Sequence, residues 1–274
     1  MAISDLELPT GVVARSDASA EAHADALAQR VADALRQAID SRGSATLVVS
    51  GGRSPVAFFG ALAQQALDWR QVLVSLADER WVPVNHASSN EALVRRHLLR
   101  GAASEAKFLG LYRVAGSLEQ AAELADAAFA ELPPIDVLVL GMGDDGHTAS
   151  LFPDSPNLDL ALRADCSRRV LPMQAPSQPA QRLTLTLPLL AGARLPLLAI
   201  QGQAKLATLA EALAPGEVAR MPIRAFLHSP LEIYWCPCHD QPRPRPARAH
   251  GRQNRRDRPH LRPGTDHAGD HHRP

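Results

Sequence analysis

"VLVLGMGDDGHTASLFP" spans residues 137–153 and joins an apolar strand to a polar, glycine-rich turn. Its first four residues are all apolar, a pattern typical of a strand that is buried on both faces. Two similar segments are "ATLVVSGGRSP" (45–55) and "LPLLAIQGQAK" (195–205), each an apolar run followed by glycine. Such units predict a mostly parallel sheet, whose strands end in loops that can bind a ligand.

Helical patterns separate these strands. In residues 19–41 apolar residues recur every fourth position and Gly43 follows, which predicts a helix. We expect further helices at 90–99, 117–131 and 203–213, further strands at 72–77, 182–188 and 231–235, and a loop over 78–89. The strand of the opening stretch is expected over 135–141. Alternating helices and strands predict an α/β protein with helices on both faces of the sheet. The polar segments 50–55, 78–80, 141–147 and 202–205 follow strands, so we expect them to share one crevice.

Composition limits the class of protein. The chain has 274 residues, three cysteines and no basic segment followed by an apolar stretch at its start. No apolar run is long enough to cross a membrane. We therefore expect a soluble, cytoplasmic protein without disulfides, a signal peptide or a membrane partner.

The last part of the chain differs from the rest. Residues 237–274 hold nine Arg and four Asp, seven Pro and six of the eleven His. The body of the chain is therefore acidic, which argues against nucleic-acid binding. We predict a single α/β domain over 1–236 and a disordered tail over 237–274, because the tail has too few apolar residues to form a core. A metal-binding or nucleic-acid-binding tail is an alternative, as is a frameshifted end.

The string "GMGDDG" (141–146) matches G-x-G-x-x-G, a dinucleotide-binding fingerprint. That fingerprint needs a long helix after the third glycine, but Pro153 and Pro156 leave room only for a short one. Asp144 and Asp145 would also repel a pyrophosphate. A dinucleotide site is therefore disfavoured, whereas "DDGH" places His147 at a strand end, where a histidine can exchange a proton.

Several other segments could hold an anion. The turn "SGGRSP" (50–55) offers backbone N–H groups, with Ser54 as a helix cap and Pro55 at the first helical position. Arg80 follows a strand in "DERWVP", although one of the acids beside it could simply pair with it. Arg182 and Lys205 could add positive charge, and an ordinary surface position stays open for each. We find no serine-hydrolase elbow and no metal-binding motif, and so expect no cofactor or metal.

Together, "SGGRSP", "DERWVP", "NEALVRRHLL", "GMGDDGHTASLFP", "QRLTLTLP" and "QGQAK" resemble the 6-phosphogluconolactonase family in order and spacing, over about residues 10–236. The resemblance implies a three-layer αβα sandwich with a modified Rossmann-like sheet. It also implies metal-free hydrolysis of 6-phospho-D-glucono-1,5-lactone, the second step of the oxidative pentose phosphate pathway. Arg53, in the glycine turn, and the tail after Trp235 depart from the family pattern.

The resemblance also implies roles for individual residues. His147 would be the general base that activates water, and Asp145 would fix its protonation state, although residues two apart need not touch. Arg80 would lie near the substrate, on its phosphate or its developing oxyanion. The residues implied to bind the phosphate are Ser50, Gly51, Gly52, Ser54, Arg182 and Lys205. The oligomeric state stays open, with a monomer as one possibility.

Two alternatives share this fold. A sugar-phosphate isomerase or deaminase resembles the chain at the glycine turn and at "DGH", but carries an acid where this chain has Phe152. Phenylalanine cannot exchange a proton. A non-catalytic sugar-phosphate-binding protein would have no need of His147. Both alternatives are therefore less favoured than the hydrolase.

Overall fold

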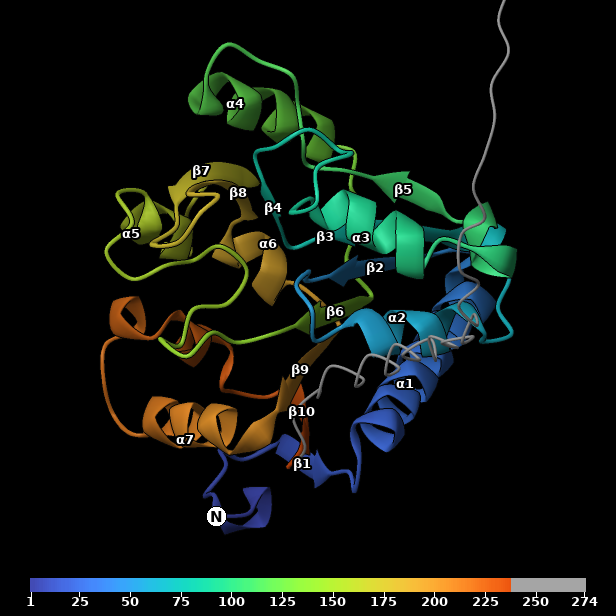
Figure 1. Cartoon of the computed structure of the whole chain (residues 1–274), viewed down its shortest axis with the longest axis vertical. Helices are drawn as coiled ribbons and strands as arrows, with labels where there is room; N and C mark the ends of the chain where they lie inside the picture. Colours follow the sequence, from blue (N-terminus) through green and yellow to red (C-terminus); the bar gives the residue numbers. More distant parts are fainter. Residues whose placement is uncertain (238–274) are drawn as a thin grey trace, which may run out of the picture. The chain divides into compact units, whose positions relative to one another are not determined.

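The computed structural model describes residues 1–237, which lie within one compact unit. In this part of the chain seven strands form a parallel sheet in the order β1-β10-β9-β6-β2-β3-β5 (Figure 1). The strands are β1 (Val12–Ser16), β2 (Ala45–Val49), β3 (Val72–Leu76), β5 (Lys107–Leu109), β6 (Val137–Leu140), β9 (Leu195–Gln201) and β10 (Leu231–Cys236). The predicted α/β fold with a mostly parallel sheet is confirmed.

Continuous apolar sequence explains the middle of the sheet. Every residue of β2 and β6 is buried, and the two strands pair in parallel from Leu47 opposite Val137. A strand buried on both faces needs no alternation of polar and apolar residues. Because β2, β6 and β9 run parallel, their carboxyl ends lie at the same edge of the sheet.

Helices cover both faces of this sheet. Their bounds are α1 (Ala20–Arg42), α2 (Val56–Ala63), α3 (Asn90–His97), α4 (Leu118–Phe129), α5 (Leu158–Leu162), α6 (Leu187–Ala191) and α7 (Gly202–Leu213). In Figure 1, α1 and α2 lie along one side of the column of strands and α7 along the other. Short 3₁₀ turns occupy Ile3–Asp5, Trp69–Gln71, Gly101–Glu105, Val218–Arg220 and Pro222–Phe226. None of the helices within residues 1–237 has the length and apolarity to cross a membrane.

Helix α1 forms where the sequence predicts it. The Ser19 hydroxyl accepts a hydrogen bond from the Ala22 N–H at 3.1 Å, and Gly43 ends the helix with a φ of 81°. A left-handed terminal residue is where glycine is favoured over other residues. The predicted cap at Ser54 is wrong, because Pro55 is the residue that precedes α2 and no side chain caps this helix.

A second sheet corrects two expectations. The segment 78–89 was expected to be a loop, but it begins with β4 (Asp78–Arg80). Strand β8 (Gln181–Leu185) was expected in the parallel sheet, but it pairs antiparallel with β4 on one side and with β7 (Val170–Gln174) on the other. Strand β8 therefore lies beside β4, the strand that follows β3 in the chain. This pairing brings the segments 78–80 and 182–184 together.

The sequence also left strands β1, β5 and β7 and helices α5 and α6 unassigned. The other predicted helices and strands are present within a few residues of their expected bounds. The tail prediction, 237–274, lies outside the described residues apart from Pro237.

Candidate active site

A pocket opens where β2, β6 and β9 end, and it collects side chains from segments far apart in the chain. It is lined by almost all the residues that the sequence singled out, namely Ser50, Gly51, Gly52, Ser54, Arg80, His147, Arg182 and Lys205. Asp145 is the exception, since it does not line the pocket but contacts His147, which does. The expected common crevice is therefore present.

His147 and Asp145 form a direct pair. Nδ1 of His147 lies 2.5 Å from Oδ1 of Asp145, and the same oxygen accepts the His147 backbone N–H at 3.0 Å. Burial by itself raises the pKa of Asp145, but these hydrogen bonds outweigh it and lower that pKa below its usual value. An ionised carboxylate only accepts hydrogen bonds, so Nδ1 carries a proton, and in the neutral ring the lone pair is on Nε2.

The turn before His147 makes room for the ring. A Cβ atom at Gly143 would lie 2.1 Å from the ring, closer than any side chain tolerates, and Gly146 has a φ of 77°. The Gly146 N–H also donates to the Gly143 carbonyl at 3.0 Å. The glycines of "GMGDDG" thus form a tight turn around a histidine, with no helix until Leu158, as the prolines indicated.

Two arginines stand side by side in the small sheet. Arg80 on β4 is paired with Arg182 on β8 in the antiparallel register. The Arg80 Nη1 group donates to the Ser88 carbonyl at 2.8 Å, while its buried Nε has no partner. Arg182 is 5% exposed, and burial lowers its pKa, an effect that the charge of Asp78 opposes and that of Arg80 reinforces. Two adjacent guanidinium groups in a pocket are a suitable site for an anion.

The sequence left open that Asp78 or Glu79 pairs with Arg80, but neither carboxylate forms an ion pair with its guanidinium group. The Asp78 carboxylate accepts the Ser150 hydroxyl at 2.6 Å. Glu79 instead accepts backbone N–H groups, from Arg80 and from the start of α3. Arg80 therefore keeps its charge available to the pocket.

The glycine turn approaches its neighbours closely. A Cβ atom at Gly51 would lie 2.0 Å from the Asn90 side chain, and Gly52 has a φ of 95°. The hydroxyl of Ser50 is buried without a hydrogen-bond partner. These features leave polar groups of the turn free to meet a ligand.

Lys205 extends into the pocket from the first turn of α7. Its Nζ lies 2.7 Å from Oδ1 of Asp144, so the first aspartate of "DDGH" holds the lysine, while the second holds the histidine. Lys205 is 29% exposed at its side chain and Asp144 80%. Because Asp144 is so open to solvent, this ion pair is weak and an anionic ligand can compete for the lysine.

Sequence reasoning missed two residues that line the pocket. Asn90 begins α3 and donates from its side chain to the Asp78 carbonyl at 3.0 Å. His23, on α1, lies 3.5 Å from the buried carboxylate of Asp17, and burial lowers the pKa of its ring. Asn90 begins the quoted segment "NEALVRRHLL", but that segment indicated only a helix, and His23 lies within a long amphipathic helical pattern, so neither was identified as a pocket residue.

Phe152 packs against the side chains of His147 and Arg182. Its ring centroid lies 4.4 Å from that of His147 and 5.4 Å from the guanidinium carbon of Arg182. The His147 ring is therefore held by an aromatic contact with Phe152 as well as by its hydrogen bond with Asp145. Within residues 1–237, no three His, Cys, Asp or Glu side chains gather as they would to hold a metal ion.

Comparisons with known proteins agree on one family. A model of "glucosamine-6-phosphate isomerases/6-phosphogluconolactonase" matches residues 18–235. A 6-phosphogluconolactonase of Pseudomonas aeruginosa is 63% identical over 238 residues, covering 86% of this chain and all of that protein. One from Pseudomonas putida is 59% identical, covering 86% of this chain and 98% of that protein. The crystal structure of a 6-phosphogluconolactonase from Shewanella baltica superposes with a TM-score of 0.80 at 38% identity, covering 84% of this chain and 100% of that one.

Proposed function

The chain belongs to the family of glucosamine-6-phosphate isomerases and 6-phosphogluconolactonases, and we propose that it hydrolyses 6-phospho-D-glucono-1,5-lactone to 6-phospho-D-gluconate. It is then a carboxylic ester hydrolase of the oxidative pentose phosphate pathway. The observation that carries the proposal is the His147–Asp145 pair, which faces a pocket with three cationic side chains. This arrangement provides one proton acceptor and several groups for a phosphate.

His147 acts as the general base in this proposal. Its Nε2 takes a proton from a water molecule as the water oxygen attacks the lactone carbonyl carbon, and Asp145 stabilises the imidazolium that results. The carbonyl oxygen becomes an oxyanion beside Arg80. The bond between C1 and the ring oxygen then breaks, and the imidazolium returns its proton to that oxygen, which leaves as the C5 hydroxyl group.

The far end of the substrate is held by its phosphate. We assign the phosphate to the turn of Ser50, Gly51, Gly52 and Ser54, together with Arg182 and Lys205. Backbone N–H groups in a glycine turn and charged side chains are common phosphate ligands. Binding energy from this remote group orients the lactone carbonyl against His147.

No observation favours the isomerase or deaminase chemistry of the same family. Aldose–ketose chemistry needs an acid that can exchange a proton with the sugar, and Phe152 fills the position beside His147 where such an acid would stand. A purely binding protein would have no use for the His147–Asp145 pair.

The test is hydrolysis of freshly generated 6-phosphogluconolactone, coupled to 6-phosphogluconate dehydrogenase. The lactone also opens unaided, so the rate without the protein is the control. We expect a rate well above that control and proportional to protein concentration. A rate equal to the control would overturn the proposal.

We further propose that residues 1–236 are the catalytic domain and that the protein acts in the cytoplasm on a small molecule. Strand β10 ends at Cys236, and every residue that we assign to the site precedes it. A chain truncated after Pro237 should therefore keep the thermal midpoint and kcat/KM of the full chain. A fall in either would show that the tail contributes.

A further inference from the structure

Glu79 is a buried carboxyl group that the proposed mechanism does not use. It is 0% exposed, lies between Asp78 and Arg80 on β4, and does not line the pocket. Its Oε1 accepts the backbone N–H groups of Arg80 at 2.8 Å and Asn90 at 2.7 Å. Its Oε2 accepts the Glu91 N–H at 2.8 Å, so one carboxylate ties β4 to the start of α3.

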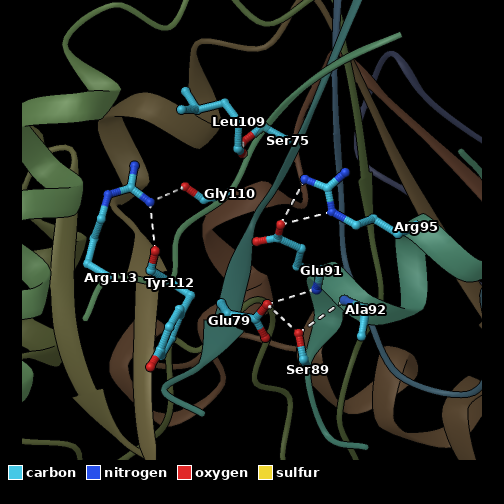
Figure 2. Close-up of polar contacts among 10 residues, drawn as sticks. All are labelled: Ser75, Glu79, Ser89, Glu91, Ala92, Arg95, Leu109, Gly110, Tyr112 and Arg113. Atoms are coloured by element: carbon cyan, nitrogen blue, oxygen red, sulfur yellow. Dashed lines mark hydrogen bonds and ion pairs between the residues drawn. The ribbon is translucent and has the colours of Figure 1, made fainter. Parts of the chain in front are cut away.

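Figure 2 shows the Glu79 side chain directed at the amino end of α3, beside Ser89. The first N–H groups of a helix have no partner within the helix, and a carboxylate is well suited to accept them. Glu79 thereby fixes the position of the segment 88–91.

This segment contacts the pocket on two sides. The Ser88 carbonyl accepts the guanidinium of Arg80 at 2.8 Å. The Asn90 side chain donates to the Asp78 carbonyl and lies so close to Gly51 that no side chain could stand there. The Glu79 carboxylate therefore holds Asn90 and Glu91, which follow the Ser88 carbonyl that anchors Arg80, and Asn90 in turn contacts the glycine turn.

We propose that Glu79 is a positioning residue for the reaction, which sets the guanidinium of Arg80 and the glycine turn at Gly51 by holding the start of α3. The proposal rests on the lactonase function proposed above. Glu79 does not touch the substrate in this view, and its effect passes through Arg80 and Asn90.

Glu91, in the first turn of α3, offers a matched comparison. It is also buried, at 9% exposed, but its carboxylate turns to the Arg95 guanidinium, with Oε1 3.0 Å from Nε (Figure 2). It does not line the pocket. The same Glu-to-Gln change can therefore be made at two neighbouring buried sites, of which only one leads to the pocket.

The experiment measures kcat and KM for Glu79→Gln, Glu91→Gln, Arg80→Ala and the double variant Glu79→Gln with Arg80→Ala, once wild-type activity is established. A glutamine keeps the size of the side chain, but its amide nitrogen cannot accept an N–H. Displacing reacting groups by about 1 Å can cost on the order of 10²-fold in rate, so we expect kcat/KM of Glu79→Gln to fall by roughly 10-fold to 10²-fold. Glu91→Gln should keep the wild-type value.

The double variant separates positioning from general damage. If Glu79 acts partly through Arg80, the loss caused by Glu79→Gln should be several-fold smaller when Arg80 is already absent. An equal loss in both backgrounds, or an unchanged kcat/KM in Glu79→Gln, would overturn the proposal. If Glu79→Gln does not fold, Glu79→Asp repeats the cycle, because its shorter carboxylate keeps the charge but cannot span the same N–H groups. An inactive wild type would instead reject the proposed function.

Discussion

Arg80 and Arg182 stand directly opposite each other on the antiparallel strands β4 and β8. Like charges at paired positions repel, and here one of the two side chains is almost fully buried. An anion between them would remove this repulsion and gain charge-assisted hydrogen bonds. The pocket is therefore electrostatically suited to a phosphate or an oxyanion.

The first prediction concerns the phosphate. Arg182→Ala should raise KM about 10- to 100-fold, because a hydrogen bond to a charged group contributes about 1.5–3 kcal/mol. In the wild type, inorganic phosphate should raise the thermal midpoint, since ligands that bind only the folded state stabilise it. The shift should shrink in Arg182→Ala.

Arg163→Ala is the control, because that arginine is exposed and pairs with Asp165 at 2.8 Å outside the pocket. It should behave as the wild type in both measurements. Unchanged KM and an unchanged phosphate shift in Arg182→Ala would remove Arg182 from the phosphate site.

The second prediction concerns the proton acceptor. His147→Ala should lower kcat by roughly 10²–10⁴-fold, the usual contribution of general base catalysis. Asp145→Asn should also lower kcat, because asparagine can offer its amide N–H to Nδ1 and so leave the wrong nitrogen facing the pocket. Steady-state kinetics with the spontaneous rate subtracted measures both. Full activity in either variant would exclude the corresponding role.

The parallel sheet could be predicted because its central strands are continuously apolar. The small sheet could not, since "DER" at 78–80 has no apolar pattern, and its strand forms only because β8 supplies the partner backbone. The pairing of Arg80 with Arg182 is a property of that register. This pairing cannot be predicted from the local sequence, because strand pairing between distant segments depends on the whole fold.

The candidate site could likewise be predicted only in part. The sequence indicated His147, and the contact with Asp145 was left open because two residues of spacing do not determine a distance. The turn at Gly146, with its positive φ, folds the chain back so that the two side chains meet. Asn90 was missed because its role comes from the place of α3 beside the glycine turn.

The third prediction uses the two aspartates of "DDGH". The Asp144 carboxylate accepts the Lys205 ammonium group at 2.7 Å, so it competes with a phosphate for that group. Asp144→Asn should therefore lower KM by a few-fold, as expected for an exposed ion pair of at most about 1 kcal/mol. Lys205→Ala should raise KM. A higher KM in Asp144→Asn would mean instead that Asp144 orients the lysine for its ligand.

The last prediction follows from the burial of Glu79. Burial raises the pKa of this carboxyl group from 4.5 to about 7, against the lowering effect of the N–H groups of Asn90, Glu91 and Arg80. A carboxyl group with a raised pKa in the folded protein stabilises the fold fully below its unfolded pKa and loses that contribution as the pH rises through the folded value. The free energy of unfolding of the wild type, relative to Glu79→Gln, should thus fall between pH 4.5 and about 7, by on the order of 3 kcal/mol. Denaturant titrations of both proteins at several pH values measure this difference. A difference that stays flat or grows with pH would show that the backbone N–H groups hold Glu79 ionised throughout.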